Sequence, residues 1–261
     1  MCYDSNAHPP ELPDGIGGGG IGQDITLTAS DGNQFAAFLA RADPSKGAQI
    51  LIYPDVRGLH QFYKELALRF ADAGMTTLAM DYFGRSAGLT ARDDSFEFMP
   101  HVGQMSWPTF TNDVRASVAH LRSLSPEPQP IFTVGFCMGG GLSLYSSMED
   151  LGLAGVIGFY AGMKRVWGEK VALPDAAIHA KIPVLGLFGG ADQSIPVEQV
   201  QALDAALDKT GVTHSIHIYG GAPHSFFDRS YAQWKDACDD AWRRMFGFIE
   251  EGKKVREDKD F

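Results

Sequence analysis

One cysteine stands where it could act as a nucleophile. Cys137 lies in the segment Gly135-Phe136-Cys137-Met138-Gly139, after an apolar run and before a glycine-rich, helix-like stretch. A nucleophile flanked by glycines two positions away, between a strand and a helix, is typical of a sharp turn that exposes a catalytic side chain. The helix N-terminus behind it would lower the pKa of the thiol. The alternative is a buried structural thiol, a common state of free cysteine.

A thiol nucleophile needs a base and an acid, and such turns are followed along the chain first by the acid and then by a histidine. Asp192 lies in LFGGADQSIP (187–196), at the end of one apolar run, and His224 lies in IYGGAPHSFFDR (218–229), after the last. Asp192 would orient the imidazole, and His224 would relay the proton. Taken alone, Asp192 could equally be a turn or helix-capping residue. The three in this order favour a catalytic triad.

The elements that must position these residues are indicated by the hydrophobic pattern. Short apolar runs alternate with amphipathic stretches, which predicts an α/β fold with a mostly parallel sheet and helices on both faces. Residues 24–41 alternate and turn at 30–33, which predicts an antiparallel hairpin at the sheet edge. Strands are expected at 48–54, 76–82, 130–136, 155–160, 183–190 and 214–220, and helices near 60–73, 109–124, 139–150, 196–210 and 231–250.

The length of 261 residues suits one large domain. We expect a flexible Gly/Pro-rich segment at 1–22, a single α/β domain at 23–250 and a frayed, charged tail at 251–261. The long irregular segment 86–108 is typical of a functional lid.

The charge balance and the cysteine content exclude several classes of protein. There are 22 Lys and Arg against 32 Asp and Glu, a net charge of −10, which disfavours nucleic acid or an anionic membrane as partner. Cys2, Cys137 and Cys238 have no metal-ligand spacing, so neither a metal site nor a disulfide framework is expected. The N-terminus does not look like a signal peptide, and no apolar run is long enough to span a membrane, which predicts a cytoplasmic protein.

Three segments together resemble the dienelactone hydrolase family. They are GFCMGGG (135–141), GGADQSIP (189–196) and GAPHSF (221–226), and the similarity runs from about Asp24 to Phe248. The resemblance implies an α/β-hydrolase fold and a carboxymethylenebutenolidase-like activity on a lactone or small carboxylic ester. It also implies that neither a metal nor an organic cofactor is used. The family's triad falls on Cys137, Asp192 and His224, with a thioester intermediate.

The resemblance also implies roles for the segment LIYPDVRG. An acidic residue after the third strand pairs with the resting thiol in the family and helps to activate it, and Asp55 stands there, one methylene shorter than the glutamate we expect. The N–H groups of Val56 and Met138 would form the oxyanion hole.

Arginines bind the substrate carboxylate in this family. Arg85, in DYFGRSAG, stands at the matching place, whereas Arg229 lies one position beyond the pattern and Asp228 occupies the expected position. Arg57 stands where a bulky apolar residue is expected and could replace the missing cation. These three arginines and Ser225 are the candidate substrate-binding residues, although each arginine could instead be a solvated surface charge.

The same residues allow three other interpretations to be compared with this one. A general carboxylesterase or a non-catalytic ligand-binding protein could use the same fold. Class I glutamine amidotransferases also place a cysteine in a glycine-rich turn, but they pair it with His-x-Glu, and no H-x-E occurs in this chain. The expected partner is a small-molecule ester or lactone, bound by a monomer or homodimer.

Overall fold

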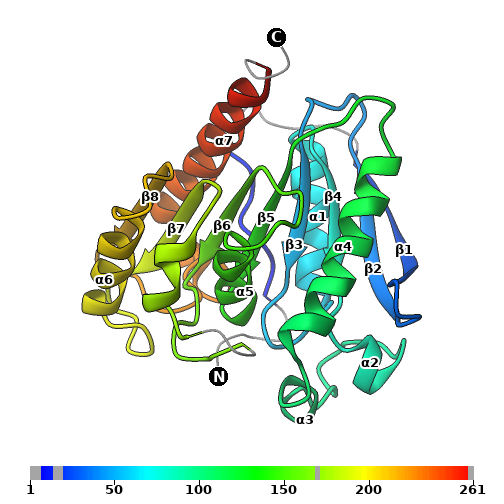
Figure 1. Cartoon of the computed structure of the whole chain (residues 1–261), viewed down its shortest axis with the longest axis horizontal. Helices are drawn as coiled ribbons and strands as arrows, with labels where there is room; N and C mark the ends of the chain where they lie inside the picture. Colours follow the sequence, from blue (N-terminus) through cyan, green and yellow to red (C-terminus); the bar gives the residue numbers. More distant parts are fainter. Residues whose placement is uncertain (1–6, 14–19, 168–170, 258–261) are drawn as a thin grey trace.

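The protein is built around one eight-stranded sheet (Figure 1). The computed structural model describes residues 7–13, 20–167 and 171–257. The strands lie side by side in the order β1-β2-β4-β3-β5-β6-β7-β8. Their bounds are Ile21–Thr28 (β1), Gln34–Arg41 (β2), Gln49–Tyr53 (β3), Thr76–Met80 (β4), Ile131–Phe136 (β5), Gly155–Phe159 (β6), Val184–Gly189 (β7) and His214–Tyr219 (β8).

The first two strands form the antiparallel hairpin that the alternation predicted. Their register runs from Ile21 opposite Arg41 to Thr28 opposite Gln34, and β2 pairs antiparallel with β4. All other neighbouring strands are parallel. The α/β-hydrolase arrangement expected from the sequence is therefore confirmed, with its antiparallel edge.

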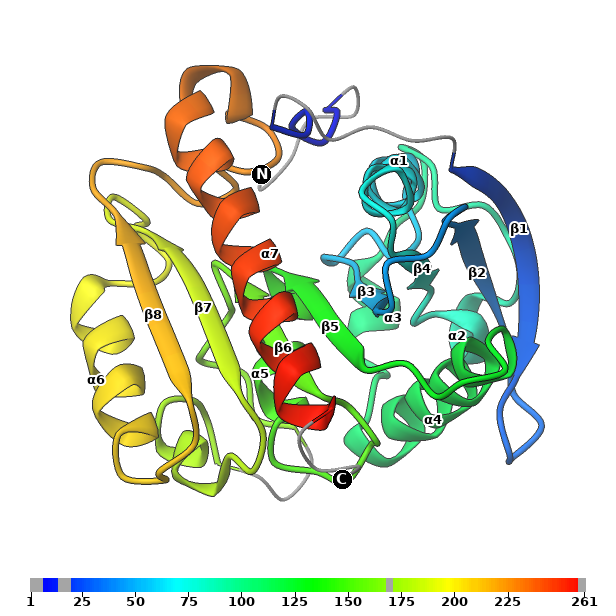
Figure 2. The same ribbon diagram turned by 90° about the horizontal axis from the view of Figure 1, so that it is seen from above.

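Helices cover both faces of the sheet. Seen from above in Figure 2, α1 and α7 lie on one face, while α4, α5 and α6 lie on the other. Because both faces are covered, β3, β4, β5, β6 and β7 are buried at every position, as their apolar sequences predict. The helix bounds are Gln61–Asp72 (α1), Gly84–Ala87 (α2), Met99–Val102 (α3), Trp107–Ser123 (α4), Met138–Ser146 (α5), Val197–Leu207 (α6) and Lys235–Glu257 (α7), with 3₁₀ turns at Asp175–His179 (η1) and Tyr231–Gln233 (η2).

Both ends of the expected domain need correction. The lead-in was expected to reach residue 22, but β1 begins at Ile21 because Ile21 and Gly22 pair with Arg41 and Ala40. The tail was expected to fray from 251, but α7 continues to Glu257. Residues 1–6 and 14–19 of the predicted lead-in, and residues 258–261 of the predicted tail, lie outside the described part of the chain.

The segment 86–108, expected to be irregular, includes the end of α2 and the single turn α3, and α4 already begins in it at Trp107. Within the described residues, no helix is both long and apolar enough to cross a bilayer.

Candidate active site

Cys137 occupies a strained turn between β5 and α5. Its backbone has φ +53°, a region that L-residues rarely adopt. Its N–H donates to the carbonyl of Phe159 (3.1 Å), and its own carbonyl accepts from Gly141 (3.1 Å) and Gly162 (3.0 Å). Strain held by surrounding hydrogen bonds is typical of functional turns. The side chain is partly exposed, as a nucleophile must be.

The glycines on either side allow this turn to close. A Cβ on Gly135 would lie 2.0 Å from the carbonyl oxygen of Gly139. A Cβ on Gly139 would lie 2.1 Å from the carbonyl oxygen of Pro54 and 2.2 Å from that of Tyr53. Only hydrogen fits at either place, so the first turn of α5 can press against the end of β3. This contact brings the loop after β3 to the cysteine turn.

Asp192 and His224 form an ion-pair-like hydrogen bond after β7 and β8. His224 Nδ1 lies 2.6 Å from Asp192 Oδ2, and the Asp192 side chain is almost fully buried. The other oxygen, Oδ1, accepts from the backbone N–H of Ser194 (2.8 Å) and Ile195 (3.2 Å). Asp192 therefore caps the turn and also contacts the imidazole. With the carboxylate as acceptor, Nδ1 carries the proton, which leaves Nε2 as the basic nitrogen.

Tyr160 was not singled out from the sequence, yet it contacts the site. It directly follows β6, and its ring centroid lies 4.9 Å from that of His224. Burial raises the pKa of Tyr160 well above its ordinary value, and the nearby Asp228, Asp55 and Cys137 raise it further. An aromatic residue at the carboxyl end of a central parallel strand was the signal that could have found it.

Backbone strain is concentrated at this edge of the sheet. Among the described residues, the non-glycine residues with positive φ are Cys137 (+53°), Tyr160 (+33°) and Ser225 (+59°). Ser225 directly follows His224 and is buried. Such conformations cost about 1–3 kcal/mol each and cluster at functional sites, so their position supports the assignment of this edge as the site.

The loop after β3 supplies a carboxylate and a backbone donor. The Asp55 carboxylate is held by Arg57, whose Nε lies 3.1 and 3.0 Å from its two oxygens. In the described part of the chain the N–H of Val56 donates to no backbone carbonyl. Met138, as the first residue of α5, likewise has an N–H without an intrahelical acceptor. Two backbone donors are therefore placed at the ends of neighbouring strands β3 and β5.

The three candidate arginines lie in different surroundings. Arg57 is buried, and its Nη2 lies 2.6 Å from Asp228 Oδ2. Arg85 is bound by Asp31 and Asp113, at 2.7 Å each. Arg229 is exposed. Asp228 and Arg57 therefore form a salt bridge with each other, and Arg85 forms separate salt bridges with Asp31 and Asp113.

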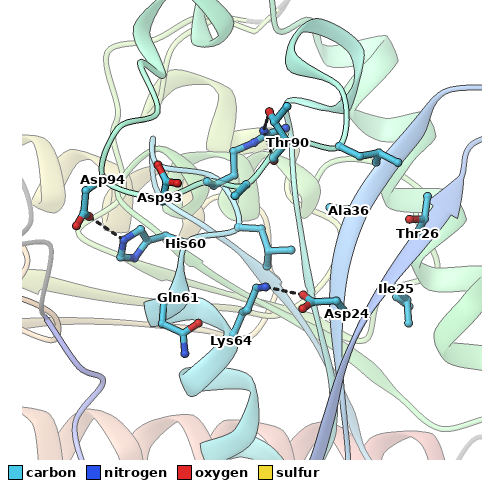
Figure 3. Close-up of a pocket in the computed structure, with 14 residues that line it drawn as sticks. Asp24, Ile25, Thr26, Ala36, His60, Gln61, Lys64, Thr90, Asp93 and Asp94 are labelled. Carbon is cyan, nitrogen blue, oxygen red and sulfur yellow. Dashed lines mark hydrogen bonds and ion pairs between the residues drawn. The ribbon is translucent and has the colours of Figure 1, made fainter.

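The cavity shown in Figure 3 has a volume of about 620 Å³ and lies between the β1–β2 hairpin, the start of α1 and residues 89–94. Two pairs of its charged side chains contact each other: Lys64 lies 2.5 Å from Asp24, and His60 Nε2 lies 3.3 Å from Asp94. It is lined by Asp24, Ile25, Thr26, Ala36, Leu59, His60, Gln61, Lys64, Leu89, Thr90, Ala91, Arg92, Asp93 and Asp94, and by none of the three triad candidates.

The two thiols described should differ in reactivity. Burial raises the pKa of Cys238 to about 12, and its Sγ lies 3.5 Å from the carbonyl oxygen of Phe226. Cys137 is partly exposed and lies at a helix N-terminus. Iodoacetamide at pH 7.5 should therefore label Cys137 in the native protein and leave Cys238 unmodified, as read by peptide mass spectrometry. Denatured protein, in which both should react, is the control, and equal labelling in the native state would contradict the assignment.

Comparisons with known proteins agree on one family. The model of the "Dienelactone hydrolase family" matches residues 35–252. A protein of Methylorubrum extorquens named "Putative carboxymethylenebutenolidase" is 29% identical over 217 residues, which is 78% of this chain and 73% of that protein. One of the same name from Saccharolobus solfataricus is 29% identical, covering 84% of this chain and 95% of that protein.

A solved structure shows the same fold. The "Putative Dienelactone Hydrolase" of Klebsiella pneumoniae superposes with a TM-score of 0.75 at 22% identity, covering 89% of this chain and 99% of that one. Since the family model spans most of the sequence, including the cysteine turn and the segments of Asp192 and His224, the chain belongs to the dienelactone hydrolase family.

Proposed function

We propose that this protein hydrolyses lactones or small activated carboxylic esters through a thioester on Cys137. The observation that carries the proposal is the 2.6 Å contact between Asp192 and His224, at the same sheet edge as the strained cysteine turn. The family and the names of the relatives support hydrolysis of a lactone-type substrate.

The proposed reaction begins with proton transfer. His224 Nε2 takes the proton of the Cys137 thiol, and the thiolate sulfur forms a bond to the carbonyl carbon of the ester. Asp192 holds the imidazole in the tautomer that can accept this proton, and it stabilises the imidazolium that results. The helix N-terminus of α5 adds a favourable field for the thiolate.

The carbonyl oxygen gains negative charge as the sulfur attacks. In the proposal, the N–H groups of Met138 and Val56 donate to this oxyanion. Because these donors belong to backbone held by the close contact of Gly139 with the end of β3, they are fixed before the substrate arrives. Pre-positioned donors of this kind contribute about 3–4 kcal/mol each in related acyl-transfer sites.

Collapse of the intermediate breaks the C–O bond of the ester and leaves a thioester. The alkoxide or enolate takes its proton from the imidazolium of His224. Water, deprotonated by His224, then attacks the thioester carbonyl, and the acid and the free thiol are released. A thiolate is itself readily expelled from the tetrahedral intermediate, so esters with a good leaving group, such as enol-lactones, are the favoured substrates.

The test is hydrolysis of an enol-lactone and of p-nitrophenyl esters by the purified protein, with rapid acid quenching and mass spectrometry. We expect turnover of both kinds of substrate and, during turnover, an acyl adduct on the peptide containing Cys137. An adduct elsewhere, or absence of turnover across the panel, would overturn the proposal.

A further inference from the structure

Three buried charged side chains form a cluster beside the cysteine turn. Arg57 lies between the two carboxylates, with Nη2 at 2.9 Å from Asp55 Oδ2 and at 2.6 Å from Asp228 Oδ2. Asp55 and Arg57 belong to the loop after β3, and Asp228 comes from the loop that follows β8, 171 positions further along the chain. All three side chains are at most 4% exposed. One cation therefore faces two anions out of contact with water.

The surroundings hold Arg57 in this position. Its guanidinium carbon lies 5.6 Å from the ring centroids of both Phe62 and Tyr63, which places aromatic faces against the cation. The Tyr63 hydroxyl also accepts the backbone N–H of Asp55 at 3.0 Å. Burial acts to lower the pKa of Arg57, but Tyr63 and the two carboxylates together hold it above its ordinary value. The guanidinium is therefore charged and is held by the two carboxylates through Nε and Nη2.

The second carboxylate is only partly neutralised. Among the described residues, Asp228 Oδ1 is buried without a hydrogen-bond partner. The pKa of Asp228 is raised to about 7, chiefly by burial. The negative charge of Asp55 also raises it, whereas the positive charge of Arg57 lowers it. With both carboxylates ionised, the cluster carries a net charge of −1.

This charge belongs to the loops after β3 and β8, the loops that also carry Val56 and His224 of the proposed site. The charges of Asp55, Asp228 and Cys137 all raise the pKa of Tyr160, so the cluster and the thiol act on the same buried side chain. Asp228 is four residues beyond His224, and Asp55 precedes Val56, whose N–H is a proposed oxyanion donor. A negative charge on the acyl group would therefore be repelled.

We propose that Asp228 is a specificity-determining residue: by occupying Arg57 together with Asp55, it makes this enzyme select acyl groups without a carboxylate. The proposal rests on the proposed function. Arg85 does not offset it, because Asp31 and Asp113 occupy that guanidinium.

The test compares two substrates of equal acyl length, p-nitrophenyl valerate and mono-p-nitrophenyl glutarate, which differ by a terminal methyl against a terminal carboxylate. Each kcat/KM is divided by the rate of alkaline hydrolysis of that ester. We expect the wild type to prefer the valerate by at least about tenfold, and Asp228→Asn to lower this preference by about tenfold or more.

A matched control removes a carboxylate from an ion pair outside the cluster. Asp24→Asn should leave the preference unchanged, because Asp24 pairs with Lys64 in the separate cavity beside α1. A shift in Asp24→Asn but not in Asp228→Asn, or a wild type that prefers the glutarate, would overturn the proposal. A wild type that cleaves neither these esters nor the enol-lactone would overturn the proposed function itself, whereas turnover with an unchanged ratio in Asp228→Asn overturns only the role of Asp228.

A pH series needs no variant. Between pH 6 and 8 Asp228 loses its proton, so the preference for the valerate should rise in the wild type and stay flat in Asp228→Asn. Changes in the nucleophile or base affect both esters alike and cancel in the ratio, and the glutarate carboxylate stays ionised throughout. A flat wild-type ratio would contradict the proposal. The titratable and charged groups that face Asp228 are Arg57 and Asp55 from the loop after β3, Tyr63 from α1, Tyr160 after β6 and Arg229 from its own loop.

Discussion

Replacing Cys137 by alanine should lower kcat/KM for p-nitrophenyl esters by about 10⁴- to 10⁶-fold. Removing the nucleophile removes the covalent step, and the oxyanion donors with the remaining Asp192–His224 pair would supply only a residual rate above water. The stability of the fold should change little, because the side chain is small and partly exposed. The measurement is steady-state hydrolysis at enzyme concentrations high enough to detect the residual rate, together with thermal unfolding.

Two further variants test this result: Cys137→Ser replaces the nucleophile by a weaker one, and Cys238→Ala is the control thiol. Serine keeps the shape but has a far less acidic hydroxyl, so we expect its activity to fall by at least about 100-fold. Cys238 lies on the buried face of α7 and contacts the carbonyl oxygen of Phe226 and none of the triad side chains, so its replacement should leave kcat/KM within about twofold. Activity of Cys137→Ala within tenfold of the wild type would disprove the thioester mechanism.

The sequence predicted the frame of the site well because the frame depends on local patterns. Short continuous apolar runs that alternate with amphipathic stretches are typical of strands covered on both faces, and parallel strands bring their carboxyl ends to one edge. The glycines around Cys137 predicted a tight turn, and the structure shows backbone carbonyls where their side chains would be. Asp192 and His224 were chosen by their positions after later strands, and their side chains lie 2.6 Å apart.

What the sequence could not predict depends on contacts between distant segments. Arg57 and Asp228 each departed from the family pattern, but only the fold shows that the two departures meet at 2.6 Å. Considered separately, Arg57 looked like an additional cation for binding the substrate, and Asp228 looked like the loss of an arginine that the family uses for this purpose. Tyr160 was missed for a similar reason, because its role depends on the rings and charges around it and on no motif of its own.

The close packing at Gly139 leads to the second large prediction, for Gly139→Ala. A methyl group there would lie 2.1 and 2.2 Å from two backbone carbonyl oxygens of residues 53 and 54, which cannot rotate away as a flexible side chain could. Overpacking of this kind costs about 3 kcal/mol, whereas the better helix propensity of alanine returns at most about 1 kcal/mol. The packing term wins, so the free energy of unfolding should fall by about 2–3 kcal/mol.

The same shift should also lower activity, because the displaced carbonyls belong to residues 53 and 54, and Asp55 and Val56 follow immediately in the chain. Misplacing a proposed oxyanion donor by about 1 Å should lower kcat by about 100-fold. Gly247→Ala in α7 is the matched control, since nothing lies within 4 Å of its added methyl. It should stabilise the fold by about 0.5–1 kcal/mol and leave activity intact. If Gly139→Ala matched Gly247→Ala in denaturant unfolding and in kcat, the contact between α5 and the end of β3 would not be what positions the proposed oxyanion donors.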